Sequence, residues 1–233
     1  VVAWPYLEKE WEGLLGKAQD EWLSFLNAFA QNETGYKIHL LVPDEVSKNF
    51  IESKIDFSNN SVEFLEFEYG DIWTRDTAPV FINSDQKLKA LCMRFNGWGG
   101  KYLMKKDDEL SRFLSSALSV DQINFNLYCE GGALETNGHG LILTTSSCVL
   151  NANRNKSCTE VEFTHALEKC LDFKELIFLR SGILNDHTDG HIDTLARFVS
   201  PQRILINSTQ AANKFNAQAL SLIHISEPTR QLC

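Results

Sequence analysis

Hydrophobic residues recur every three or four positions over Trp4–Phe29, the spacing of one buried face on an amphipathic helix. Tyr36–Val42 is predicted to be a strand. A short helix is expected next, starting at Pro43-Asp44 with the Asp44 side chain as its cap. Apolar and acidic residues then alternate over Val62–Glu68, which predicts a half-buried strand.

The remaining pattern continues to alternate strands with helices. Further strands are predicted at Pro79–Asn83, Leu88–Phe95, Ile123–Leu127, Ala133–Thr136, Gly140–Thr145, Leu176–Arg180, His191–Val199 and Arg203–Asn207. Further helices are predicted at Lys105–Leu118, at Thr159–Leu171 and from about Ala211. Thr159 and Glu162 match the capping box that fixes a helix start. No linker rich in Pro, Gly or Ser interrupts the alternation, so one α/β architecture is predicted.

Composition and charge narrow the class of protein. The chain has 233 residues, of which 43% are hydrophobic, and this excludes an intrinsically disordered chain. No apolar run approaches the roughly 18 residues that span a bilayer. The 22 basic and 31 acidic residues give a net charge of −9, which disfavours nucleic acid and anionic membranes as partners and suits a cationic ligand.

Six cysteines are scattered along the chain without a CxxC pair. Their density does not indicate a disulfide scaffold, so reduced thiols in the cytoplasm are expected. The six are Cys92, Cys129, Cys148, Cys158, Cys170 and Cys233.

The last part of the chain departs from the pattern. Over residues 221–233 the helical periodicity is lost, and Pro228 follows with nothing after it to pack against. Residues 221–233 are therefore expected to be a non-native tail. Residues 1–220 are expected to be the N-terminal portion of a single domain.

Polar residues and glycines gather at the ends of predicted strands in four places. Glycines beside charged residues indicate loops in which the backbone comes close to a ligand. The four places are Asp71–Asp76, Asn96–Gly100, Glu130–Gly132 and Asn185–Asp193.

The densest of these clusters allows two kinds of site. His187 and His191 stand four residues apart, as in a zinc protease, but Gly190 between them argues against a helix and no glutamate base is in place. Alternatively, His191 and Asp193 lie on one face of a strand, as an imidazole beside a carboxylate. With a second carboxylate from Asp76, this arrangement suits a planar guanidinium.

A purely structural role for the same acidic residues stays open. Asp186 and Asp189 could cap turns, and Asp193 could pair with Arg197 as part of the scaffold.

Five motifs in order resemble a known family, the agmatine deiminases, which form the bacterial peptidylarginine-deiminase-like branch of the guanidino-group-modifying superfamily. A shorter match at Ala3-Trp-Pro5 with Trp11 extends the resemblance over nearly all of the chain up to about residue 215. The five motifs are Asp71-Ile-Trp-Thr-Arg-Asp-Thr-Ala-Pro79, Phe95-Asn-Gly-Trp-Gly-Gly100, Glu130-Gly-Gly132, Thr144–Asn155 and Asp189-Gly-His-Ile-Asp193.

The resemblance implies a pseudo-five-fold α/β propeller, the pentein fold, built of ββαβ-type units around a central active site. It implies a cytoplasmic protein that needs no metal or organic cofactor and forms homodimers when full length. By motif match, Asp76 and Asp193 would clamp the substrate guanidinium and His191 would be the general acid/base. Substrate-binding roles would fall to Trp73, Trp98, Glu130 and His187, where His187 replaces an acidic residue near the far end of the substrate in several family members.

The implied reaction converts agmatine to N-carbamoylputrescine and ammonia through a thiolate nucleophile, which the family carries in a Gly-rich motif near the C-terminus. None of the six cysteines lies in such a motif, and Cys148 matches a different family position. The chain is therefore expected to lack the nucleophile and the last blade, to release no ammonia by itself and to aggregate. The alternatives are deimination of arginine or peptidyl-arginine, and an inactive module that binds guanidino compounds or polyamines.

Overall fold

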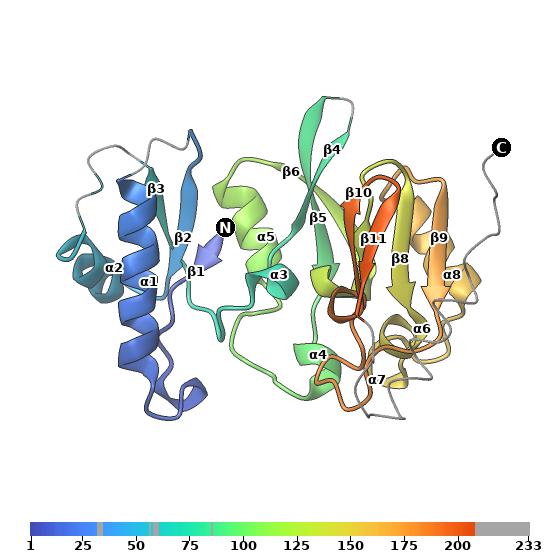
Figure 1. Cartoon of the computed structure of the whole chain (residues 1–233), viewed down its shortest axis with the longest axis horizontal. Coiled ribbons are helices and arrows are strands. Elements are labelled where there is room, and N and C mark those ends of the chain that lie inside the picture. Colours follow the sequence, from blue (N-terminus) through green and yellow to red (C-terminus); the bar gives the residue numbers. More distant parts are fainter. Residues whose placement is uncertain (32–34, 56, 58–60, 85, 208–233) are drawn as a thin grey trace.

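The strands of the protein form four small sheets that follow one another along the chain (Figure 1). The computed structural model describes residues 1–31, 35–55, 57, 61–84 and 86–207. The strands are β1 (Val2–Ala3), β2 (Ile38–Val42), β3 (Val62–Glu66), β4 (Val80–Ser84), β5 (Lys87–Arg94), β6 (Asp121–Tyr128), β7 (Glu135–Thr136), β8 (Leu141–Thr145), β9 (Glu175–Leu179), β10 (Ala196–Ser200) and β11 (Arg203–Ile206).

The helices include several that are only one turn long. The α-helices are α1 (Leu15–Ala30), α2 (Glu45–Glu52), α3 (Thr74–Thr77), α4 (Gly97–Gly100), α5 (Leu110–Ala117), α6 (Ser146–Val149), α7 (Ala152–Asn155) and α8 (Glu160–Glu168). The 3-10 turns are η1 (Glu8–Glu10), η2 (Gly131–Ala133) and η3 (Ile192–Thr194). None of the helices in the described part of the chain is both long and apolar enough to cross a membrane.

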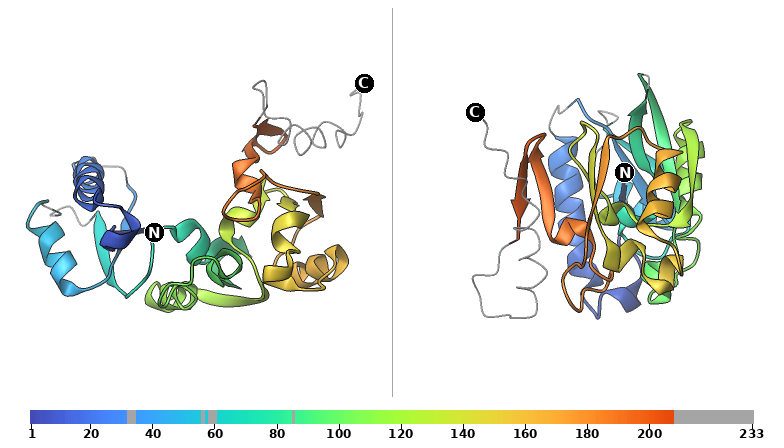
Figure 2. Two further views of the ribbon diagram at one scale, coloured as in Figure 1. Left: turned by 90° about the horizontal axis from the view of Figure 1, so that it is seen from below. Right: turned by 90° about the vertical axis from the view of Figure 1, so that its right-hand side faces the viewer.

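A ββαβ unit occurs twice in succession. The hairpin β4–β5 is antiparallel, and β6 joins β5 in parallel after the crossover through α5. The hairpin β7–β8 is likewise antiparallel, and β9 joins β8 in parallel after α8. Before these units, β1, β2 and β3 pair in parallel with α1 and α2 as crossovers, and after them β10 and β11 form a hairpin. The four sheets lie along an arc (Figure 2).

Local sequence signals fix the starts of two helices as predicted. The Asp44 carboxylate accepts a hydrogen bond from Ser47 N at 2.7 Å, which caps α2. At α8, Thr159 Oγ1 accepts from Glu162 N at 3.2 Å and Glu162 Oε2 accepts from Thr159 N at 2.8 Å. Both halves of the capping box are present.

Apolar clusters hold each unit together and join it to the next. Trp4, Leu26 and Leu40 belong to a cluster within the first sheet and its helices. The cluster around Tyr69 and Leu114 joins the first and second units. A larger cluster, which contains Phe125, Cys148 and Phe163, spans the second and third. The loop ends of the units are thereby held in fixed relation, which positions the site described below.

The structure corrects several predicted boundaries. The helix predicted over Trp4–Phe29 begins only at Leu15, because Glu12 and Gly13 adopt positive φ angles of 47° and 80° that end any helix before them. The helix predicted over Lys105–Leu118 begins at Leu110, since Lys106 has a φ of 63°.

Two predicted strands begin with 3-10 turns instead. The segment predicted as the strand His191–Val199 opens with η3, and β10 starts only at Ala196. The strand predicted over Ala133–Thr136 is preceded by η2 and shortens to β7. The helix predicted from about Ala211 and the tail predicted over residues 221–233 lie outside the described residues.

Candidate active site

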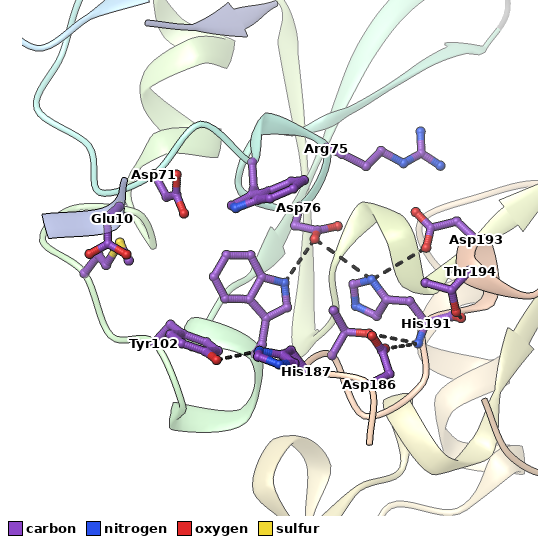
Figure 3. A pocket seen from close by; sticks show the side chains of 14 residues that line it. Glu10, Asp71, Arg75, Asp76, Tyr102, Asp186, His187, His191, Asp193 and Thr194 are labelled. Atoms are coloured by element: carbon purple, nitrogen blue, oxygen red, sulfur yellow. Dashed lines mark hydrogen bonds and ion pairs between the residues drawn. The ribbon is translucent and has the colours of Figure 1, made fainter. Parts of the chain in front are cut away.

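A cavity of about 650 Å³ opens where the loops that follow β3, β5 and β9 meet (Figure 3). Its wall is rich in acidic and aromatic side chains. It is lined by Glu10, Asp71, Trp73, Arg75, Asp76, Trp98, Tyr102, Met104, Asp186, His187, Thr188, His191, Asp193 and Thr194.

Three short helical turns bring the polar groups at one end of the cavity together. Each turn precedes a hairpin of the repeated architecture: α3 precedes β4, η2 precedes β7 and η3 precedes β10. The first turn carries Asp76, the second carries Gly132, and the third carries Asp193 with His191 just before it. The repeat of the fold therefore builds the site from equivalent positions of successive units.

The imidazole of His191 lies between two carboxylates. Its Nδ1 atom is 3.9 Å from Asp76 Oδ2 and 3.9 Å from Asp193 Oδ1 (Figure 3). Asp76 is held in place by hydrogen bonds from Gly132 N at 2.8 Å and from Trp98 Nε1 at 3.0 Å. The strand that was predicted to align His191 with Asp193 is absent from these residues, and the η3 turn brings the two side chains together instead.

Gly132 forms the floor between these three side chains. A Cβ atom at this position would lie 2.5 Å from His191 Nδ1, 2.8 Å from Asp193 Oδ2 and 2.9 Å from Asp76 Oδ1. These separations are well below van der Waals contact, so any side chain here would push the three groups apart. Glycine is required at this position because of space.

A buried ion pair supports the imidazole from the side away from the cavity. Arg154 Nε donates to Glu130 Oε1 at 2.8 Å, and both side chains are almost fully buried. Glu130 Oε2 lies 3.4 Å from His191 Nε2. Glu130 was predicted to be a substrate-binding residue, but the structure places it behind His191 and outside the cavity wall.

The surroundings of His191 change its protonation. Burial by itself lowers the pKa of the imidazole, but Cys148, Glu130 and Asp76 raise it, and the net result is a pKa of about 10. Burial raises the pKa of Asp193, while the nearby His191 opposes that shift. At neutral pH the site therefore holds a protonated imidazole that faces two carboxylates, and a proton is available for a leaving group.

The loop before His191 is held by its own acidic residues. Asp186 Oδ2 accepts hydrogen bonds from the Thr188 hydroxyl, from Gly190 N at 3.1 Å and from His191 N at 3.4 Å. Asp189 pairs with Lys101 and Arg154, each at 2.5 Å. The turn-capping role considered for Asp186 is therefore present, and Asp189 also serves the scaffold.

Asp193 does not share the scaffold role of those two residues. Arg197, its candidate partner, makes its ion pair with Glu135 at 3.2 Å. Asp193 instead faces His191 in the cavity (Figure 3).

Aromatic side chains line the middle of the cavity. Trp98 sits in the left-handed region with a φ of 53°, between Gly97 and Gly99, which also have positive φ angles. This backbone aims the indole N–H at Asp76. Tyr102 stacks on His187 with a centroid separation of 5.8 Å, and its hydroxyl lies 2.6 Å from His187 Nδ1. Trp73 also lines the cavity and is 57% exposed.

Two carboxylates occupy the opposite end of the cavity. Glu10 and Asp71 line the cavity at the side away from His191 and Asp193 (Figure 3). Burial raises the pKa of Asp71, and the charge of Glu10 raises it further. This end of the cavity therefore attracts a positive charge.

Most of the site residues predicted from the sequence do meet in this cavity. Asp76, His191, Asp193, Trp73, Trp98 and His187 all line it. Three features of the site were not predicted from the sequence: the steric role of Gly132, the ion pair of Arg154 and the position of Glu10. The Glu-Gly-Gly motif was the one sequence signal for Gly132. Arg154 and Glu10 reach the site by tertiary packing, which the sequence pattern does not show.

No cysteine of the described residues lines the cavity, although Cys148 lies behind His191. Cys92, Cys129 and Cys148 are buried, and Cys158 and Cys170 are half-buried. The metal site considered for His187 with His191 is not formed, since His187 bonds to Tyr102 and belongs to no cluster of three metal donors within the described part of the chain.

Comparison with known proteins places this geometry in a family. The chain is 30% identical over 214 residues to a Mycoplasma mycoides protein named "Putative agmatine deiminase", and the match covers 89% of the chain and 57% of that protein. A solved variant of C. jejuni agmatine deiminase with substrate bound is 26% identical to this chain, with a TM-score of 0.80. The alignment covers 96% of this chain and 67% of the C. jejuni chain. A solved "Putative Arginine Deiminase" from Porphyromonas gingivalis is 28% identical with a TM-score of 0.80, covering 96% and 66%.

These likenesses confirm the expected pentein architecture, and the chain spans a little over half the length of its Mycoplasma relative. The sequence model of one family, Porphyromonas-type peptidyl-arginine deiminase, matches residues 1–226. With nearly the whole chain matched, the protein belongs to the Porphyromonas-type peptidyl-arginine deiminase family.

Proposed function

We propose that this chain supplies the guanidinium-binding and acid/base part of an agmatine deiminase, which hydrolyses agmatine to N-carbamoylputrescine and ammonia in polyamine metabolism. The observation that carries the proposal is the arrangement of Asp76 and Asp193 around the buried imidazole of His191. The solved C. jejuni protein, which is named as an agmatine deiminase, supports it as a relative.

The two carboxylates suit a guanidinium for reasons of charge and shape. A guanidinium is planar, always charged and donates hydrogen bonds in forked pairs, which a carboxylate accepts with both oxygens. Asp76 is held by Gly132 and Trp98, so it needs no rearrangement to receive such a group. Two carboxylates beside one protonated imidazole leave one negative charge, which the bound guanidinium neutralises.

The opposite end of the cavity favours agmatine over arginine. Agmatine carries an ammonium at its far end, whereas arginine carries a carboxylate there as well. Glu10 and Asp71 would attract the ammonium and repel the carboxylate. The aromatic side chains of Trp73 and Trp98, which also line the cavity, suit the methylene chain that links the charged groups.

The chemistry that these residues support is a two-step displacement at the guanidinium carbon. A thiolate attacks this carbon, and His191 gives its proton to the departing ammonia, which leaves a thiouronium on the sulfur. The neutral imidazole then takes a proton from water, which attacks the same carbon and releases the ureido product with the thiol. The carboxylates hold the guanidinium plane in line for both attacks.

The thiolate must come from outside the described cavity wall, which contains no cysteine. We therefore expect the 233-residue chain to bind agmatine without steady ammonia release. Turnover is expected from a protein that continues this chain to the length of its relatives. Steady turnover by the chain itself would show that one of its own cysteines reaches the guanidinium carbon in the cavity.

The test measures kcat/KM for ammonia release from agmatine in a protein of that length which begins with this chain. Asp76→Asn and Asp193→Asn keep the size of each side chain and remove its charge. Each is expected to cost about 3–5 kcal/mol of transition-state stabilisation, roughly a thousandfold in kcat/KM. The control is Asp20→Asn on the exposed side of α1, which should leave kcat/KM unchanged.

Activity of either Asn variant within a few fold of the parent would remove that residue from the clamp. Binding of agmatine by the parent without any ammonia release would instead favour the inactive binding module. Equal kcat/KM for agmatine and arginine would show that Glu10 and Asp71 do not select the substrate.

A further inference from the structure

The side of His191 that faces away from the cavity presents an unusual set of donor atoms. Glu130, Cys148 and His191 each offer one ligand atom there, and the three atoms lie within 4.8 Å of one another. All three residues are buried, with exposures of 1%, 0% and 2%. The catalytic role proposed above uses the opposite edge of the imidazole, where Nδ1 faces Asp76 and Asp193 (Figure 3).

The Nε2 atom of His191 lacks a hydrogen-bond partner among the described residues, although it is fully buried. A buried polar nitrogen without a hydrogen bond is costly, and here the Glu130 carboxylate offers an ion pair but no hydrogen bond. Glu130 Oε2 lies 3.4 Å from this nitrogen, in a direction that makes no hydrogen bond. Two atoms that each lie about 2.05 Å from a tetrahedral zinc ion are about 3.3 Å apart, which is close to the observed spacing.

The third donor completes a set of nitrogen, oxygen and sulfur. A zinc-bound sulfur lies about 3.6 Å from the other ligand atoms, so the Cys148 sulfur would need to move by about 1.2 Å at most. Zinc binds cysteine sulfur, histidine nitrogen and carboxylate oxygen in a tetrahedral geometry. With three protein ligands of these types, water would take the fourth position. Calcium and magnesium prefer sites built only from oxygen.

The groups around these donors resemble the outer shell of a metal site. Histidine ligands commonly present their other ring nitrogen to a carboxylate, and Nδ1 of His191 faces Asp76 and Asp193. Ligating carboxylates are themselves hydrogen-bonded, and Glu130 Oε1 accepts from Arg154 Nε at 2.8 Å. Arg154 divides its charge between Glu130 and Asp189, and zinc would displace the protons of Cys148 and His191 when it binds.

We propose that Glu130, Cys148 and His191 form a zinc-binding site behind the cavity, which is distinct from the guanidinium-binding face of the same imidazole. A zinc ion bound there would hold His191 through Nε2 and prevent that imidazole from exchanging its proton. Zinc would thereby inhibit the reaction, and this consequence rests on the proposed function, whereas the binding site itself does not.

The experiment uses the 233-residue chain and measures metal binding without any activity assay. Co²⁺, which substitutes for zinc in tetrahedral sites, reports a thiolate ligand through its absorption spectrum. We expect one Co²⁺ per chain with tetrahedral bands and a thiolate charge-transfer band, displaced by Zn²⁺. Zn²⁺ affinity is measured by competition with a chromophoric chelator.

Variants then identify the ligands. Cys148→Ser is expected to remove the thiolate band and to weaken Zn²⁺ binding at least about tenfold, and His191→Gln is expected to weaken it as much. Cys158→Ser changes a half-buried thiol outside the site, so it should leave the thiolate charge-transfer band and the Zn²⁺ affinity unchanged. No Co²⁺ binding, or a thiolate band that survives Cys148→Ser, would overturn the proposal, the second result pointing to another cysteine such as Cys233.

X-ray absorption at the zinc edge of the unmodified chain tests the site even if the variants fail to fold. One sulfur at about 2.3 Å with nitrogen and oxygen neighbours at about 2.0–2.1 Å is expected. A shell without sulfur, or one with two or more sulfurs, would contradict the assignment. Either result leaves the proposed deiminase function to be judged by agmatine turnover alone.

Discussion

At the scale of single residues, the site depends on one position that carries no side chain. Gly132 donates its N–H to Asp76 and leaves room for His191 and Asp193 around it. Its φ angle is not the left-handed kind that only glycine tolerates, so the reason for glycine is space alone. The Glu-Gly-Gly motif was visible in the sequence, but its steric purpose appears only when three distant segments are brought together.

Replacing Gly132 by Ala should therefore disrupt ligand binding more than folding. The added Cβ forces Asp76, His191 and Asp193 to move apart, because each would lie within 3.0 Å of it. Agmatine binding to the chain, measured by calorimetry, is expected to weaken at least about tenfold, which corresponds to about 1.4 kcal/mol. Gly16→Ala in α1, where a Cβ meets no atom within 4 Å, is the control and should bind agmatine like the parent. Equal agmatine binding by both variants would mean that the side chains around Gly132 can accommodate a methyl group without moving apart.

At the scale of elements, three loops are joined by one buried arginine. Arg154 on α7 donates to Glu130 beside η2, to Asp189, and to the Thr188 carbonyl at 2.9 Å. The loop that carries His191 is thus attached to the middle of the third unit. Long-range contacts of this kind leave no periodic trace in the sequence. The Thr144–Asn155 motif, which contains Arg154, therefore indicated the family resemblance but not these contacts.

Arg154→Met should lower the free energy of unfolding by about 3–5 kcal/mol, because it leaves Glu130 buried without its partner. The matched control is Lys105→Met, which removes an ion pair of the same 2.8 Å length to Glu68 on the exposed surface. That pair is solvated, so its loss should lower the free energy of unfolding much less than the loss of Arg154 does. Urea unfolding of the two variants measures the difference, and similar losses in both would contradict the buried role of Arg154.

The boundaries of some helices and strands could be predicted from the sequence. Helix starts with a local cap, at Asp44 and Thr159, were predicted correctly, since the signal and the structure lie within one turn. The strand predicted over His191–Val199 was wrong at its start, because the η3 turn replaces the extended backbone there and β10 begins only at Ala196. Apolar spacing does not report such turns, and the turns carry the site.

At the scale of the whole molecule, the repeated unit explains why the chemistry gathers in one place. Successive units place α3, η2 and η3 at equivalent positions, and the arc of the sheets brings these turns together (Figure 2). The alternation of strands and helices predicted an α/β fold from the sequence. The repeat geometry was an implication of the resemblance, and residue periodicity alone does not contain it.

The most direct test of the guanidinium site compares agmatine with putrescine as ligands of this chain by titration calorimetry. Putrescine keeps the ammonium and the methylene chain but lacks the guanidinium. If Asp76, His191 and Asp193 bind the guanidinium, agmatine is expected to bind at least about tenfold more tightly, a difference of about 1.4 kcal/mol, and Asp76→Asn or Asp193→Asn is expected to abolish this preference. Equal affinities for the two ligands, or a preference that survives both substitutions, would show that Asp76, His191 and Asp193 do not form a guanidinium site.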